Sequence, residues 1–78
     1  MHLDTQDLKT ARHALRERAA WAATRGFFWL SERDTRMLER LEISGHLSDA
    51  DVRHMYAVLK RVGGPDNEAL ARRIATRI

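Results

Sequence analysis

Apolar side chains recur every three or four positions along most of the chain, which is the spacing that gathers them on one face of an α-helix. Asp4 or Thr5 is the expected N-terminal cap of a first helix that runs to about Arg25. Gly26 is expected to end it, because glycine readily takes a positive φ. The apolar positions of this segment fall within about 80° of one another on a helical wheel, and they are Leu8, Ala11, Leu15, Ala19 and Ala22.

A second helix is predicted after a short apolar connector, Phe27–Leu30. Ser31 is its expected cap, because Asp34 follows three positions later and the two match a variant of the capping box with Asp in place of Glu. Gly45 is expected to end this helix, and its buried face is expected to consist of Met37, Leu38 and Leu41.

The clearest helix start in the chain lies at residues 47–52. Ser48 is the expected cap, and Leu47 and Val52 have the spacing of a hydrophobic staple, in which the residue before the cap packs on the first turn. Gly63 and Gly64 are expected to end this third helix. Its apolar face is predicted to be Val52, Met55, Tyr56, Leu59 and Val62.

A fourth helix is predicted to begin at Pro65, since a proline at the first helical position loses no hydrogen bond. Its inner face is expected to consist of Leu70, Ile74 and Ile78. Alternating apolar and polar runs, the signal for strands, are almost absent. The fold class expected from these segments is all-α, a compact bundle of about four short helices that forms a single domain over residues 1–78.

Length and composition narrow the class of protein further. The chain has 78 residues, a net charge of +3 and no Cys, so neither a disulfide framework nor a thiolate metal site is expected. No apolar run approaches the roughly 18 residues of a membrane span, and the N-terminal residues lack the pattern of a signal peptide. We therefore expect a cytoplasmic protein without a membrane partner.

Catalytic and metal-binding patterns are weak. Ser31 and Ser48 are explained as helix caps, and no nucleophile motif or phosphate-binding glycine loop occurs. One group of four potential metal ligands lies within nine residues, but its spacing matches no known zinc site, and its members are His46, Asp49, Asp51 and His54. The two Asp suit a helix N-terminus and the two His are expected to be solvated. We expect no enzyme activity, no metal and no cofactor.

A helix-turn-helix is the natural hypothesis for a small basic helical chain. With Gly45 in the turn, however, the packing positions of the next helix fall on Asp51 and His54, where apolar residues are expected. Asp49 and Asp51 also place anions where a duplex would approach. The sequence therefore disfavours this motif.

Cationic rows on helix faces are better candidates for binding. Twelve of the fourteen cations are Arg, whose planar guanidinium suits phosphates and carboxylates. One row, in the first helix, consists of Lys9, Arg12, His13 and Arg16. Another, in the second helix, consists of Arg33, Arg36 and Arg40, and is weakened if Glu32 and Glu39 pair with Arg36.

Four of the five aromatic residues lie within nine positions, and they are Trp21, Phe27, Phe28 and Trp29. These rings either complete a thin core or form an exposed anchor for a partner. Successive side chains leave the backbone in different directions, so we expect one or two of residues 27–29 to be buried and at least one of Trp21, Phe28 and Trp29 to be exposed. The predicted partner-binding residues are Lys9, Arg12, Arg16, Trp21, Phe28 and Trp29.

These features predict a non-enzymatic regulator or inhibitor that docks on a nucleic-acid-processing protein complex. In size alone the chain is similar to the small inhibitors of phages and mobile elements, including anti-CRISPR proteins. Two alternatives stay open: a direct, largely non-specific nucleic-acid-binding protein, and a homodimeric structural module with the aromatic residues at its seam.

Overall fold

The computed structural model describes residues 1–78 and contains four helices: α1 (Thr5–Thr24), α2 (Phe28–Ser44), α3 (Asp49–Val62) and α4 (Pro65–Ala75). The prediction of an all-α bundle of about four short helices is therefore confirmed. The only strand-like pairing is an isolated antiparallel bridge between His2 and His46. No helix is both long enough and apolar enough to cross a membrane.

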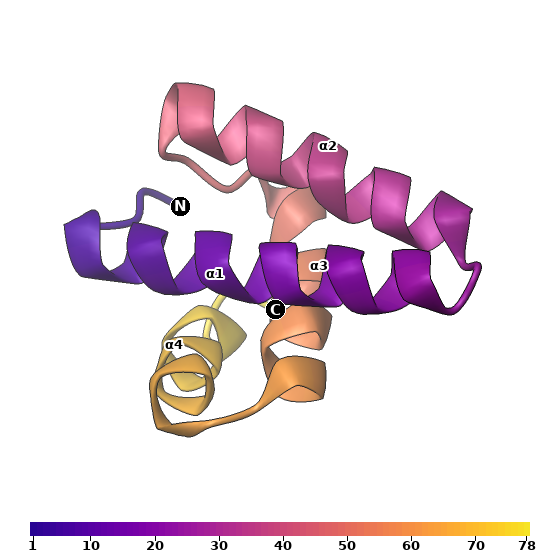
Figure 1. Ribbon diagram of the computed structural model, residues 1–78. Coiled ribbons are helices and arrows are strands. Elements are labelled where there is room, and N and C mark those ends of the chain that lie inside the picture. The colour runs from indigo at the N-terminus through magenta and orange to yellow at the C-terminus, as the bar shows by residue number, and fades with distance from the viewer.

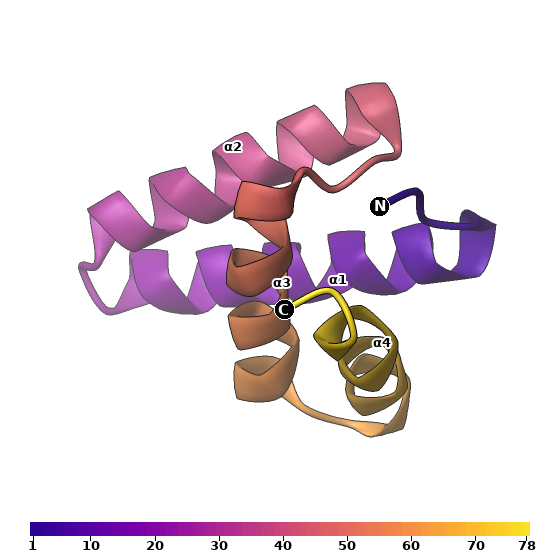
Figure 2. The same cartoon turned by 180° about the vertical axis from the view of Figure 1, so that it is seen from behind.

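The longest helix, α1, lies at the centre of the arrangement and contacts the other three. In Figure 1, α2 runs back along α1 in the antiparallel direction, so that the two form a hairpin. Figure 2 shows α3 crossing α1 steeply, with α4 beside α3 on the side of α1 away from α2. One end of the α1–α2 hairpin therefore projects away from α4.

The turn between α1 and α2 is shorter than the sequence suggested. Gly26 has a φ of 79°, its N–H donates to the Ala23 carbonyl, and the Phe27 N–H donates to the Ala22 carbonyl. This pair of hydrogen bonds is a Schellman motif, which ends one helix and turns the chain sharply. Phe27 is then the N-terminal cap residue of α2 and Phe28 its first residue.

The predicted connector at residues 27–30 is consequently wrong, as is the predicted cap at Ser31. The Ser31 N–H already donates to the Phe27 carbonyl over 3.0 Å, so Ser31 lies inside the helix. Asp34 makes no capping bond, because its carboxylate reaches across to other helices instead.

The signals at the start of α3 are confirmed. The Asp51 N–H donates to the Ser48 side chain over 3.2 Å, and Leu47 and Val52 are both buried, as a hydrophobic staple requires. Gly45 ends α2 with a φ of 64°, in the left-handed region. Leu3 is buried against this loop, since its N–H donates to the Gly45 carbonyl over 3.2 Å.

The core is a single cluster to which all four helices contribute. In α1 the predicted stripe is confirmed, with Ala11, Leu15 and Ala22 fully buried and Ala19 partly so. The α3 face is also confirmed, with Tyr56 and Val62 at its half-buried edge. In α4, Leu70 and Ile74 are buried, but Ile78 lies beyond the end of the helix and is 54% exposed, so its predicted burial is wrong.

Candidate functional site

Three side chains from three helices meet in an ion-pair network that is almost entirely removed from solvent. Asp34 of α2 is fully buried, and the side chains of Arg18 on α1 and His54 on α3 are 11% and 7% exposed. Arg18 donates from Nε to Oδ2 of Asp34 and from Nη2 to Oδ1, each over 2.7 Å. His54 Nε2 lies 2.7 Å from the same Oδ1. We name these three residues the buried triad.

The charge state of the buried triad follows from its geometry. Nε2 of His54 also lies 3.0 Å from Nη2 of Arg18, and a guanidinium only donates, whereas a carboxylate only accepts. We assign the proton to Nε2 because its contact with Asp34 is the shorter of the two. Burial alone raises the pKa of Asp34, but hydrogen bonds from Arg18 and His54 and their positive charges outweigh this effect. The pKa of Asp34 is therefore held below its ordinary value of 3.8.

Acid is expected to remove the contribution of Asp34 to stability. A carboxyl group whose pKa is lower in the folded than in the unfolded chain stabilises the fold above the unfolded pKa, and this stabilisation is lost as the pH falls through the folded pKa. In urea unfolding between pH 5 and pH 2, the difference in unfolding free energy between the natural chain and Asp34→Asn should therefore shrink once the pH drops below about 4. A difference that stays constant to pH 2 would contradict this assignment.

The buried triad corrects one expectation. His54 was expected to be solvated, but it is bound within the protein, because its position on α3 faces Asp34. Asp51 likewise faces α2 and accepts from Arg40 Nη2 over 2.8 Å. The polar side of α3 therefore faces α2, and its apolar side packs against α1 and α4. In a helix-turn-helix the apolar side of this helix would pack against the preceding helix instead. No group of three or more His, Asp or Glu side chains is arranged to hold a metal ion.

Large aromatic side chains are exposed at the turn of the α1–α2 hairpin. Phe27 is 44% exposed, Phe28 70% and Trp29 67%. We name these three residues the aromatic tip. The expectation that one or two of them are buried is wrong, because the sharp turn at Gly26 places Phe28 and Trp29 in the first turn of α2, beyond the reach of the core. The expectation that at least one aromatic side chain is exposed is confirmed.

Trp21 is close to the aromatic tip in sequence, but its side chain is less exposed than those of the tip. Its ring is half-buried and lies 5.9 Å from the Phe27 ring, centroid to centroid. The guanidinium groups of Arg25 and of Arg61, on α3, lie over it at 5.3 and 5.4 Å. Such cation–π contacts stabilise by about 0.5–1 kcal/mol each at exposed sites. Trp21 therefore packs against Phe27 of the aromatic tip and, through Arg61, connects α1 to α3.

The cationic row of α1 is separate from the aromatic tip. Lys9 precedes Trp21 by twelve positions, which is about 18 Å along a helix. Arg16 donates to Glu42 of α2 over 3.1 Å, Arg12 is half-buried, and His13 pairs with Glu17 over 2.9 Å. The structure therefore does not bring the six predicted partner-binding residues together: Lys9, Arg12 and Arg16 lie on one surface, and Phe28 and Trp29 on another.

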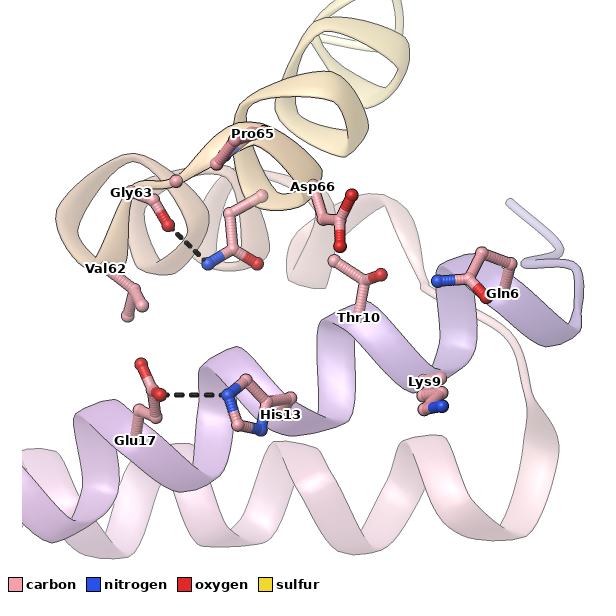
Figure 3. Close-up of a pocket in the computed structure, with 11 residues that line it drawn as sticks. Gln6, Lys9, Thr10, His13, Glu17, Val62, Gly63, Pro65 and Asp66 are labelled. Atoms are coloured by element: carbon pink, nitrogen blue, oxygen red, sulfur yellow. Dashed lines mark hydrogen bonds and ion pairs between the residues drawn. The ribbon is translucent and has the colours of Figure 1, made fainter.

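Lys9 and His13 border a pocket of about 490 Å³ between α1 and the α3–α4 turn. Figure 3 shows the Asp66 carboxylate pointing across it toward Thr10, while the Asn67 side chain donates to the Gly63 carbonyl over 2.6 Å. Its lining carries one Lys against two carboxylates, Glu17 and Asp66, so it offers no excess of positive charge to an anionic ligand.

Sequence reasoning missed the buried triad, although a signal for it was present. Asp34 lies three and seven positions before Met37 and Leu41, so it occupies the apolar face of its own helix. A carboxylate on a buried face needs a cationic partner. The sequence did not identify that partner, because Arg18 is one of twelve Arg residues.

The chain was also compared with models of protein families, with curated proteins and with solved structures, and none of them matches it.

Proposed function

We propose that this protein is a non-enzymatic regulator or inhibitor that docks its aromatic tip on a protein of a nucleic-acid-processing complex. The observation that carries this proposal is the exposure of three consecutive large aromatic side chains at one end of the hairpin. Trp is among the residue types enriched at binding hot spots, and a contiguous exposed apolar patch commonly marks a protein interface. We further propose that it acts in the cytoplasm.

The aromatic tip is suited to enter an apolar pocket of a partner. Phe28 and Trp29 lie on a helix and Phe27 is fixed by two backbone hydrogen bonds to the following turn, so little conformational entropy is lost when they become buried. An exposed apolar patch rimmed by polar residues is a common mark of a protein interface.

The surrounding charges favour a partner with an acidic rim. Arg25, Arg33 and Arg61 lie close to the aromatic rings, and none of them pairs with a carboxylate of the chain. Carboxylates of a partner would therefore meet guanidinium groups whose donors are free. A second candidate surface for partner binding, separate from the aromatic tip, consists of Lys9, Arg12 and Arg16.

Removing one aromatic ring should separate binding from folding. We expect Phe28→Ala to change the unfolding free energy by less than about 0.5 kcal/mol, because the side chain is already exposed, and to weaken partner binding by about 2 kcal/mol. The measurement is capture of the partner from the native host with nuclease present, followed by titration of the purified partner. Ile43→Ala is the matched control, since Ile43 is 89% exposed on the same helix but far from the tip.

Three results would contradict the proposal. Equal partner binding by Phe28→Ala and the natural chain would remove the aromatic tip from the interface. Capture that is lost on nuclease treatment would favour direct nucleic-acid binding instead. A dimer in sedimentation that Phe28→Ala dissociates would identify the aromatic tip as the seam of a homodimer.

A further inference from the structure

A groove of about 530 Å³ runs between α2 and the first turns of α3, on a different face from the pocket that Lys9 borders. Three Arg side chains and one exposed indole ring lie along its α2 wall. Its lining residues are Trp29, Glu32, Arg33, Arg36, Arg40, Ala50, Asp51 and His54. We name it the arginine groove.

The α2 wall is a continuous row. Trp29, Arg33, Arg36 and Arg40 are spaced by four, three and four positions, which places them within about 60° on one face of the helix. The row extends about 16 Å from Trp29 to Arg40 at 1.5 Å per residue. An aromatic ring at one end is thus followed by three guanidinium groups in line.

Most guanidinium donors in the groove are free. Each guanidinium has five N–H donors. Arg33 pairs with no carboxylate, Arg36 donates from Nη2 to Glu32, and Arg40 donates from Nε and Nη2 to Asp51. The Arg36–Glu32 pair is largely exposed, and such pairs contribute little stability, so an incoming phosphate can replace Glu32. Arg40 stays paired with Asp51 through Nε and Nη2, and its other donors are free.

The buried triad lies behind the groove wall. His54 lines the groove, and its Nε2 is bound to Asp34. Its Nδ1 has no hydrogen-bond partner within the chain. Every buried side-chain nitrogen or oxygen atom of the protein has such a partner, so Nδ1 is not buried. Nδ1 is therefore reached by solvent from the groove. The network fixes this ring, so the groove has a rigid polar floor.

We infer that the arginine groove binds a short single-stranded nucleic acid, with a base stacked on Trp29 and phosphates bound by Arg33, Arg36 and Arg40. An unpaired base presents its ring face to the indole, whereas a duplex hides that face. A peptide of Asp and Glu alone would match the cations but would leave the 67% exposed indole without a partner.

The test uses the full chain and a fluorescent ten-nucleotide oligothymidine, followed by anisotropy at several salt concentrations. We expect micromolar binding that weakens steeply with salt and does not depend on base sequence. Trp29→Ala should weaken binding by about tenfold or more. Arg33→Ala should weaken it too and should lower the slope of log K against log salt by about 0.7, the value for one phosphate of a single strand.

Matched controls separate this site from general charge and from exposed apolar surface elsewhere on α2. Arg72→Ala removes the same charge as Arg33→Ala from α4 and should change binding little. Ile43→Ala removes an exposed apolar side chain of α2 that does not line the groove, and it should leave binding unchanged. Equal binding of a ten-base-pair duplex, equal binding of a polyglutamate peptide, or equal losses for Arg33→Ala and Arg72→Ala would each overturn the inference. No binding at low salt would overturn it as well, without affecting the proposed docking of the aromatic tip.

Discussion

Replacing Asp34 with Ala is expected to lower the free energy of unfolding by about 3–5 kcal/mol, because it leaves a buried cation without its counter-charge. Arg18 is 11% exposed and loses both of its hydrogen bonds to the carboxylate, and His54 loses its acceptor. A chain of 78 residues has a total stability of about 4–12 kcal/mol. Urea unfolding followed by circular dichroism should therefore show a large drop in the midpoint, or a chain that is unfolded without urea.

Two controls locate the cause of this loss. Glu42→Ala also removes one carboxylate from an Arg pair, but this pair is exposed and its loss should cost less than about 1 kcal/mol. Replacing all three members together, as Arg18→Met, Asp34→Leu and His54→Leu, should restore most of the stability, since a well-packed apolar group needs no counter-charge. If Asp34→Ala unfolds at the same urea concentration as the natural chain, the buried triad does not hold the three helices together.

Leu15→Ala is expected to cost about 2–5 kcal/mol, the range for truncating a fully buried leucine. Leu15 is 0% exposed and lies midway along α1, the helix that contacts the other three. Its immediate neighbours on the α1 stripe are small Ala residues, which cannot extend to fill the space left behind. Thermal and urea unfolding measure the loss.

Ile43→Ala is the matched control for this prediction. It removes an apolar side chain of similar volume from a position that is 89% exposed, so the change in unfolding free energy should stay within about 0.5 kcal/mol. Equal losses for Leu15→Ala and Ile43→Ala would mean that the core is not centred on α1.

Helix number and most helix ends were predictable because local signals determine them. Asp4 and Ser48 accept from backbone amides of their own first turns, and Gly45 adopts the left-handed conformation at the end of α2. These contacts lie within a few residues, so the sequence displays both partners. The predicted start of α2 was wrong because a local signal was misleading. Ser31 has a plausible capping pattern, but α2 begins three residues earlier, directly after the Schellman motif at Gly26.

The candidate surfaces were only partly predictable, because they depend on contacts far apart in the sequence. Trp29 and Arg33 can be placed on one helix face from their spacing, but the opposite wall of the arginine groove comes from α3. His54 reaches a residue twenty positions away, which no spacing rule reveals. The aromatic tip is exposed because the end of the α1–α2 hairpin projects beyond the core, whereas hydrophobicity alone predicts that these three side chains are buried.

The position of the aromatic tip also affects how this protein can evolve. Substitutions at Phe28 and Trp29 meet few constraints from the fold, since both side chains are about two-thirds exposed or more. Selection for stability removes mutations that destabilise the core and does not act on mutations that leave stability unchanged. Relatives of this chain should therefore keep the buried triad and the α1 stripe, and keep Trp29 where the arginine groove is used. The residues at positions 27 and 28 should diverge, each lineage matching a different partner on the same scaffold.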